Sequence, residues 1–348
     1  MLKKKFIILG TAIAILLVSW HYLTYAPPTE AQPRDRIRGV WLTHVGTSAL
    51  SYSNLTDKAF HSLAAQNFNT VYIDVYNRGV TYRSKYAPRN RWISFPFTNP
   101  FNKAIHAAKR QGLSVYGWYE YGMMAGLNDE LSRRHPDWLL TTPGGEQYIE
   151  KHLWLDPNNP EVREYFVNLF SEAAYLYPKL TGIQLDDHWG IPAVFGNYQQ
   201  AMNSLTREVN AAVKKANPDM ILSLSPNPYG FSLTKYSQDW MLWLKKGWFD
   251  ELVMQIYRPN SNSVRQSTLT SGIQQASNYV SVAVGIYAGG EDNLKSLEEI
   301  NNQTQTVTEL GYGYAIFTWE YYATTARIIV VWIRKLLYLI FSLVGLLK

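Results

Sequence analysis

The chain has 348 residues, of which 47% are hydrophobic and 17% charged, and its formal net charge is +6. This length suits one large α/β domain, and the mild, scattered basic charge argues against nucleic acid as a partner. Because the chain has no cysteine, disulfides, zinc–thiolate sites, cysteine nucleophiles and a lipid-modified N-terminal cysteine are excluded.

The N-terminal segment has the pattern of a secretory signal. Lys3, Lys4 and Lys5 precede an apolar run from Phe6 to Trp20. We therefore expect residues 1–26 to be a signal peptide or an uncleaved membrane anchor, and the proline-rich, polar residues 27–36 to be a linker. This pattern predicts an exported protein that is periplasmic, membrane-anchored or extracellular.

Between residues 37 and 326, short β-rich runs alternate with longer segments that carry apolar residues at helical spacing. This alternation is typical of parallel strands joined by crossover helices. Eight such units predict an α/β fold, a (β/α)₈ TIM barrel over residues 37–326. The expected strands are Gly39–His44, Val71–Tyr76, Ser114–Tyr121, Gly182–Trp189, Ile221–Asn227, Glu251–Tyr257, Val282–Tyr287 and Tyr314–Tyr321, and the expected helices include Asp57–Asn67, Phe101–Gln111, Pro160–Tyr177, Asn197–Ala216 and Asn293–Leu310.

Polar and acidic side chains follow the C-terminal ends of these runs, which is where barrel enzymes place their chemistry. Because successive side chains of a strand face opposite sides, we expect Glu120, Asp186 and Glu320 to point to the barrel axis and converge. In the last strand the same alternation places Ile316 and Thr318 inward. The side chains at the strand ends are Glu120, Asp186, Asp187, Asn227, Gln255, Tyr257, Arg258 and Glu320.

Paired carboxyl groups are what glycosidic bond cleavage usually needs, one as proton donor and one to attack or to activate water. Crowding of Asp186 and Asp187 in a partly buried rim would raise the pKa of one of them. The predicted catalytic residues are Asp186 as nucleophile or water activator and Glu320 or Glu120 as general acid, with Asp187 in reserve for either role. In the alternative interpretation, Asp186 or Asp187 caps the following helix or pairs with Arg258.

Aromatic residues make up 14% of the chain, and several stand at strand ends. Sugar rings pack their apolar faces on aromatic rings, and their hydroxyls bond to Asn, Gln, His and Tyr. A ring taken alone is more often part of the core, and only a position at the rim favours sugar contact. The predicted substrate-binding residues are Trp41, His44, Trp118, His188, Trp189, Asn227, Gln255, Tyr257, Arg258 and Trp319.

The sequence carries no familiar metal or cofactor motif. It has neither His-Glu-x-x-His, a Cys/His cluster, a Gly-rich phosphate loop nor a Gly-x-Ser-x-Gly elbow. We therefore expect no cofactor and no metal. A divalent cation held by Asp186 and Asp187 is the alternative, because oxygen-only sites leave weak traces in a sequence.

The C-terminal segment from Ile328 to Leu347 is almost wholly apolar, with Arg334 and Lys335 near its middle. A spanning helix needs roughly 20 apolar residues, and two adjacent cations make insertion costly. Residues 327–348 are expected to form an apolar helix that is the final barrel helix, an interfacial helix or a membrane helix. Membrane contact is thus predicted at the N-terminal segment, and the C-terminal segment offers a second candidate.

Several motifs occur in order between Arg38 and Tyr322, among them Arg38-Gly39-Val40-Trp41-Leu42, His135-Pro136-Asp137-Trp138, Leu155-Asp156-Pro157-Asn158-Asn159-Pro160 and Gly182-Ile183-Gln184-Leu185-Asp186-Asp187. In these motifs the chain resembles the glycosyl hydrolase-like family ten of bacterial envelope proteins. The resemblance implies a barrel that acts on glycans, including cell-wall polysaccharide, and matches the family's paired aspartates to Asp186 and Asp187. The chain departs from the family at His188, where an aromatic is common, and in the tail after Ala326.

Taken together, these features predict a glycoside hydrolase that cleaves O-glycosidic bonds of an envelope or extracellular polysaccharide, with the glycan of peptidoglycan as one option. The alternative is a non-catalytic glycan-binding barrel protein of the cell envelope. A third interpretation, a membrane-anchoring or membrane-remodelling protein, explains the apolar termini but not the acids at the strand ends.

Overall fold

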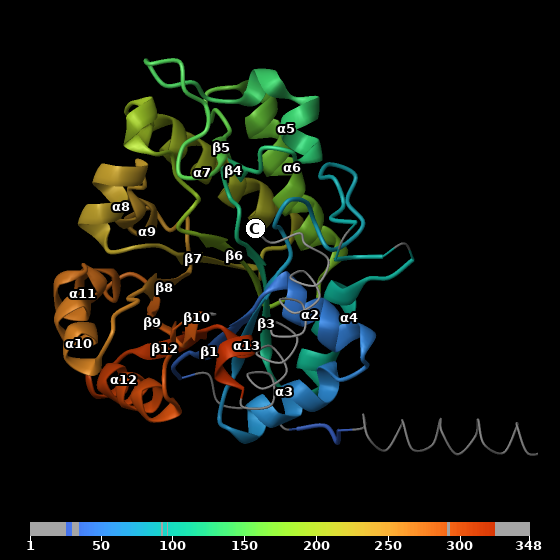
Figure 1. Ribbon diagram of the computed structural model, residues 1–348, viewed down its shortest axis with the longest axis vertical. Helices are drawn as coiled ribbons and strands as arrows, with labels where there is room; N and C mark the ends of the chain where they lie inside the picture. The colour runs from blue at the N-terminus through green and yellow to red at the C-terminus, as the bar shows by residue number, and fades with distance from the viewer. Residues whose placement is uncertain (1–25, 30–34, 92, 96, 291–292, 324–348) are drawn as a thin grey trace, which may run out of the picture.

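The computed structural model describes residues 26–29, 35–91, 93–95, 97–290 and 293–323. Eight parallel strands close into a barrel, and helices surround it (Figure 1). Each strand falls within or beside one predicted run, so the predicted TIM barrel is confirmed. The barrel strands are β1 (Arg38–Leu42), β2 (Thr70–Asp74), β3 (Ser114–Tyr119), β6 (Gly182–Asp186), β7 (Ile221–Ser225), β8 (Glu251–Gln255), β9 (Ser281–Tyr287) and β12 (Gly313–Phe317).

The crossover helices begin at the start signals that the sequence carries. Asn99, Asn159 and Ser296 each accept a hydrogen bond from a backbone N–H in the first helical turn, and proline follows the two asparagines. The helices are α2 (His44–Tyr52), α3 (Thr56–Ala65), α4 (Pro100–Arg110), α5 (Glu130–Arg134), α6 (Pro160–Leu176), α7 (Gln199–Ala216), α8 (Tyr229–Tyr236), α9 (Trp240–Lys245), α10 (Ser261–Thr270), α11 (Ile273–Ala276), α12 (Leu297–Glu309) and α13 (Trp319–Tyr322).

Two short antiparallel ladders interrupt the alternation at the C-terminal side of the barrel. One pairs β4 (Met124–Ala125) with β5 (Leu153–Trp154) in the segment between β3 and α6. The other pairs β10 (Gly289–Gly290) with β11 (Asn293–Leu294) after β9. The segment between β3 and α6 is therefore an elaborated loop that lies next to the end of β6.

The hydrophobic core has two parts. The larger part lies between the strands and the surrounding helices, and it includes Ile73, Leu185 and Phe170. A smaller part fills the barrel itself, where Trp41 stacks on Tyr72 with ring centroids 5.2 Å apart. Its members are Ile37, Trp41, Tyr72, Tyr116, Trp118, Val253, Ala283 and Ala315.

The last barrel strand faces the opposite way from the prediction. Ala315 belongs to the inner cluster with Phe317 packed against it, whereas Ile316 lies in the outer core. The strand also ends at Phe317, and Trp319–Tyr322 forms the short helix α13. The prediction that Ile316 faces the axis was wrong, because apolar side chains occupy both faces of this strand and alternation alone cannot distinguish them.

Both predicted terminal segments lie largely outside the described residues. Residues 1–25 of the predicted signal or anchor, part of the linker 27–36 and all of residues 327–348 fall there. Within the linker, the backbone N–H of Thr29 donates to the carbonyl of Arg110 at the end of α4. None of the helices that the structure describes is both long and apolar enough to cross a membrane.

Candidate active site

A pair of carboxyl groups lies at the C-terminal ends of β2 and β3. Asp74 is the last residue of β2 and is completely buried, and Glu120 directly follows β3. His44 Nδ1 lies 2.8 Å from Asp74 Oδ2, and the backbone N–H of His44 donates to the same oxygen at 3.3 Å. Asn77 Nδ2 donates to Glu120 Oε2 at 2.6 Å. Both carboxyl groups are thus held in place by neighbours from the loops that follow β1 and β2.

The environment of Glu120 favours its protonated form. Burial raises the pKa of Glu120 well above its ordinary value, and the charge of Asp74 and a hydrogen bond to it raise the pKa further. The amide of Asn77 acts in the opposite direction, and the charge of Asp187 adds a smaller increase. Glu120 therefore keeps its proton in a pH range in which an exposed glutamate would be ionised.

A second carboxyl pair ends β6. Gln255 Nε2 donates to Asp186 Oδ1 at 2.6 Å, and Asn227 Nδ2 donates to Asp187 Oδ2 at 2.7 Å. Burial raises the pKa of Asp186 well above its usual range, and the charges of Asp187, Glu120 and Asp74 add to that increase. The two pairs are therefore close enough to affect each other's ionisation, and together they form one acidic cluster of Asp74, Glu120, Asp186 and Asp187.

His188 lies at the edge of this cluster. Its Nδ1 is 3.1 Å from Asp187 Oδ1 and 3.9 Å from Asp186 Oδ2, a close approach whose angles do not make a hydrogen bond. The ring lies next to Trp154, with centroids 6.2 Å apart. His188 is thus brought to the mouth together with the paired aspartates, and the segment between β3 and α6 supports it.

Aromatic side chains form the facing side of the mouth. The ring of Tyr257 lies 5.4 Å from that of Tyr287 and 5.5 Å from that of Phe317. The pKa of the Tyr257 hydroxyl is raised well above its usual range by burial and then by the charges of Asp186, Asp187 and Glu120. Tyr257 therefore lies between the aromatic side chains and the acidic cluster, where an uncharged hydroxyl can donate to a carboxylate or a sugar oxygen.

Glu320 does not join the acidic cluster. Its Oε1 accepts hydrogen bonds from the backbone N–H of Thr43 at 2.9 Å and from the Thr43 hydroxyl at 2.6 Å. The side chain packs against Gly46, where a Cβ atom would lie 1.9 Å from Oε1. Because β12 ends early and α13 redirects the chain, this carboxyl lies at the N-terminus of α2, where the helix dipole favours a negative group.

Several predicted sugar-binding residues lie away from the mouth. Trp189 is buried between α6 and α7, where it contacts Phe166 and donates to Thr206. Trp41 and Trp118 are buried inside the barrel beneath Phe317. The remaining two are Trp319, which packs on the outer core, and Arg258, whose guanidinium bonds to Ser267 of α10. The structure brings His44, His188, Asn227, Gln255 and Tyr257 to the mouth instead.

The predicted site residues did not include three residues of the mouth, Asp74, Asn77 and Tyr287. Alternation along β2 places Asp74 on the same side as Tyr72, because Val71, Ile73 and Val75 are the outward residues. That signal was available, since Asp74 also ends a strand. Asn77 and Tyr287 are distant in the sequence from the predicted acids at the mouth. Only the folded chain brings them to the mouth together with these acids.

Two groups of three potential donors each lie within 4.8 Å of one another: His44, Asp74 and Glu120, and Asp186, Asp187 and His188. Imidazole nitrogen and carboxylate oxygen are donors that divalent cations accept. In the first group, the contact between His44 and Asp74 and the bond between Asp74 and Glu120 already account for the close approach. Hydrogen bonds thus account for the approach in the first group, whereas in the second group His188 lies 3.1 Å from Asp187 without such a bond.

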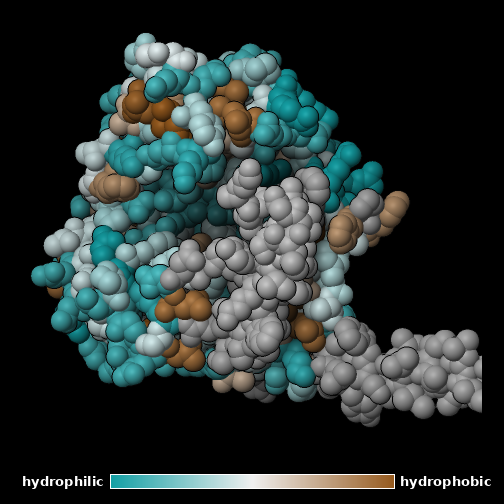
Figure 2. Space-filling view, viewed as in Figure 1, coloured by the Kyte–Doolittle hydropathy of each residue, from teal (hydrophilic) through white to brown (hydrophobic). Residues whose placement is uncertain are grey.

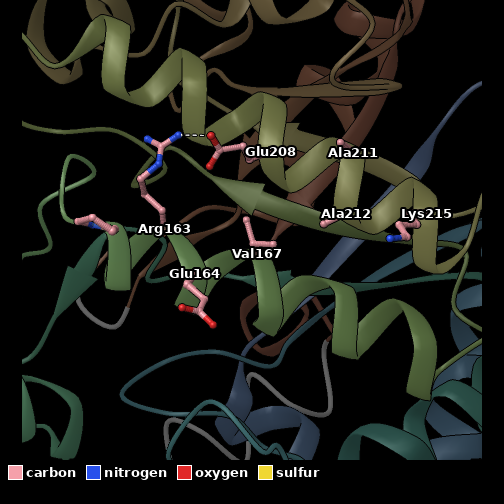
Figure 3. A pocket seen from close by; sticks show the side chains of 8 residues that line it. Arg163, Glu164, Val167, Glu208, Ala211, Ala212 and Lys215 are labelled. Carbon is pink, nitrogen blue, oxygen red and sulfur yellow. Dashed lines mark hydrogen bonds and ion pairs between the residues drawn. The ribbon is translucent and has the colours of Figure 1, made fainter.

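A separate groove of about 530 Å³ lies on the outside of the barrel, between α6 and α7 (Figure 3). Arg163 and Glu208 form an ion pair across it at 2.5 Å. The groove holds none of the strand-end acids, so we place the candidate active site at the barrel mouth. On the face shown in Figure 2, a hydrophilic hollow lies near the ends of β6 and β7.

Solved structures share this fold. The glycoside hydrolase domain of PgaB (BpsB) from Bordetella bronchiseptica matches with a TM-score of 0.62 and 13% identity, over 85% of this chain and 98% of that one. A variant of the GH36 α-galactosidase AgaA from Geobacillus stearothermophilus, in complex with raffinose, matches with a TM-score of 0.55 and 16% identity, over 85% of this chain and 40% of AgaA. This chain thus spans less than half the length of AgaA, and likenesses at such identities show the fold alone.

The sequence also matches a family. No curated protein sequence matches the chain. The family described as glycosyl hydrolase-like 10 matches residues 36–206 and 198–307. The chain therefore belongs to this family, as its motifs predict.

Proposed function

We propose that this member of the glycosyl hydrolase-like 10 family hydrolyses O-glycosidic bonds of an envelope or extracellular polysaccharide, the glycan of peptidoglycan among them. The observation that carries the proposal is the acidic cluster of four carboxyl groups at the barrel mouth, in which burial and mutual repulsion keep Glu120 protonated. Acid–base cleavage of a glycosidic bond requires one protonated carboxyl group and one ionised carboxylate near each other. Family membership and the barrel fold agree with this chemistry.

In the proposed reaction, Glu120 donates its proton to the glycosidic oxygen as the bond to the anomeric carbon breaks. Asp186, in its ionised form, attacks that carbon or takes a proton from the water that does. The Gln255 amide, 2.6 Å from Asp186, stabilises the ionised form. Asp187 is the alternative candidate for the general acid or for the nucleophile, and the Asn227 amide orients its carboxylate.

Asp74 acts through Glu120 in this proposal. It is too deeply buried to reach a substrate, and its carboxylate is occupied by His44 and Glu120. Its charge makes ionisation of Glu120 costly, so Glu120 regains a proton after each turnover. Tyr257 and the neighbouring rings of Tyr287 and Phe317 supply the surface on which a sugar would pack.

The experiment that tests the proposal measures the release of reducing ends from purified cell-wall glycan, with and without its peptides, and from neutral polysaccharides. Wild type is compared with Asp186→Asn and Glu120→Gln, and Glu320→Gln is the matched control for loss of a buried carboxyl outside the cluster. We expect release by wild type and by Glu320→Gln, and none by the first two variants. Glycan binding without release by folded wild type would support the non-catalytic glycan-binding alternative.

Export to the envelope is part of the same proposal and rests on the N-terminal sequence pattern. Fractionation of cells that express the full chain tests it. We expect the chain in the membrane or outside the cytoplasm, and a cytoplasmic location would contradict this part of the proposal without affecting the hydrolase activity.

A further inference from the structure

The loop of residues 75–99, which connects β2 to α4, differs in charge from the rest of the chain. It contains Arg78, Arg83, Lys85, Arg89 and Arg91 and no Asp or Glu. Its charge of +5 compares with a formal net charge of +6 for the whole chain, which leaves +1 for all other residues. In the rest of the chain cations and acids nearly balance, whereas this loop at the rim of the barrel mouth carries cations only.

The same loop exposes apolar side chains at its tip. Phe97 is 104% exposed and Phe95 is 53% exposed relative to the isolated residue. In Figure 2 this tip is the hydrophobic projection at the right edge, where the loop before α4 extends from the body in Figure 1. Fully exposed phenylalanine is costly in water, because its ring makes no compensating contact.

Hydrogen bonds hold the tip in this position. The guanidinium of Arg89 donates to Ser94 Oγ at 2.6 Å and to the carbonyls of Phe95 and Thr98. The hydroxyl of Tyr52, from α2, donates to the carbonyl of Ile93 and accepts from the N–H of Phe95. The apolar tip is thus part of a hydrogen-bonded loop in which the ring of Phe95 packs on that of Tyr52 and the ring of Phe97 is fully exposed.

The cations not used in this network remain exposed. The side chains of Arg83, Lys85 and Arg91 are exposed, and none of them forms an ion pair within the described part of the chain. Glu172 contacts this part of the loop through Ser84 Oγ and the backbone N–H of Lys85, and not through any of the three cationic side chains. These three side chains are therefore available to an anionic partner.

We propose that the side chains of Phe95 and Phe97 and the cations Arg83, Lys85 and Arg91 dock the barrel onto a bilayer surface that contains anionic lipids. Exposed aromatic rings enter the boundary between headgroups and acyl chains, while Lys and Arg lie at the level of the phosphates. A lipid surface fits better than an anionic polysaccharide, because Phe97 is fully exposed and no described residue makes a ring contact with it that would fix it as a platform for a sugar.

This inference goes beyond the proposed hydrolase activity and is independent of it. Because the loop leaves the C-terminal end of β2, docking through its tip would bring the barrel mouth close to the membrane surface. Glycan strands next to the membrane would then be within reach of the acidic cluster.

The absence of cysteine from the chain allows a direct test with the full-length protein. A single cysteine in the variant Phe97→Cys is labelled with the environment-sensitive dye NBD, and Leu269→Cys on α10, which is also exposed, carries the dye as the matched control. Vesicles of phosphatidylcholine alone are compared with vesicles that also contain phosphatidylglycerol. A dye at the tip reports on the loop itself, whichever other segment binds the vesicle.

We expect a blue shift and an intensity increase at position 97 with anionic vesicles only, and no change at position 269. Replacing Arg83, Lys85 or Arg91 with glutamine in the labelled chain should lower the response, about fivefold in partitioning for each cation. High salt should weaken the response in the same way.

Three results would overturn the docking proposal. The first is an unchanged dye at position 97 while the chain sediments with the vesicles. The second is an equal response to neutral vesicles, which would remove the role of the cations. The third is a response to soluble polygalacturonate but not to vesicles, which would assign the loop to an anionic polysaccharide.

Discussion

The side-chain amide of Asn77 donates to Oε2 of Glu120 across 2.6 Å, and the same carboxyl group also hydrogen-bonds to Asp74. An amide donor and a carboxylate acceptor beside one carboxyl group is the pattern that a protonated glutamic acid satisfies. Glutamine offers the same two functions, because its carbonyl can accept from Asn77 and its amino group can donate to Asp74.

The variant Glu120→Gln should therefore fold normally and lose hydrolysis by about a hundredfold or more, since the amide cannot donate a proton to the leaving oxygen. The measurement is the rate of reducing-end release together with the circular dichroism spectrum. Near wild-type turnover in a folded variant would remove Glu120 as the general acid.

The same variant should change the pH dependence of stability. In the unfolded chain the Glu120 carboxyl ionises near its ordinary pKa of 4.5, whereas the folded state keeps the proton to higher pH. Folding then binds a proton, so the wild type loses stability as pH rises from about 4.5 toward the raised pKa, by about 1.4 kcal/mol for each unit of difference. Glu120→Gln lacks this loss and should gain in melting temperature relative to wild type as pH rises. A difference that is constant with pH would show that the pKa of Glu120 is not raised.

Asp74→Asn should shift the alkaline limb of the kcat/KM profile to lower pH by about one unit or more, because the pKa of Glu120 falls when the neighbouring charge is removed. The contact with His44 is retained in part, since asparagine keeps one oxygen acceptor. A uniform loss of activity at all pH values, with no displacement of the limb, would assign Asp74 a purely structural role.

Gln255→Leu should shift the acidic limb of the kcat/KM pH profile. Without the amide that donates to Asp186 Oδ1, the pKa of Asp186 rises further, so the acidic limb of the profile should move to higher pH by about one to two units. The pH–rate profile checks this result, and Gln255→Glu is not a suitable control because it adds another acid. An acidic limb at the wild-type position would indicate that a different group sets it.

Glu320→Gln should leave the rate and its pH profile close to those of wild type. Its carboxylate binds Thr43 at the start of α2, so the change removes a charged partner from the helix N-terminus and should cost about 1–2 kcal/mol of unfolding free energy. Thermal unfolding measures the cost. A displaced pH profile in this variant would return Glu320 to the list of candidate acids.

Trp189→Ala should destabilise the fold by about 3–5 kcal/mol, because the side chain is buried between α6 and α7 beside Phe166. Trp189→Phe should cost much less, since it keeps the ring packing and loses only the bond to Thr206. At temperatures where both variants are folded, KM for glycan should equal that of wild type. A raised KM in Trp189→Phe would indicate that this residue contacts substrate after all.

Local patterns in the sequence were enough to determine the eight strands, most of the crossover helices and the position of two of the acids. Strand alternation and helix start signals are short-range properties, so Glu120 and Asp186 could be placed at the mouth from their own neighbours. Family motifs added the pairing of Asp186 with Asp187. The same local reasoning failed at β12, because Ile316 and Phe317 are both apolar and suit either face of the strand.

What only the tertiary structure decided was which side chains meet. Asp74 approaches Glu120 because β2 and β3 pair in parallel with Asp74 beside Trp118, a register that depends on hydrogen bonds between distant segments. Glu320 is held at Thr43 because α13 turns the chain away from the barrel axis. The raised pKa values of Glu120 and Asp186 likewise depend first on burial, which only the fold decides. Charges from other strands add to both, and of all these causes the sequence shows only the adjacent charge of Asp187 beside Asp186.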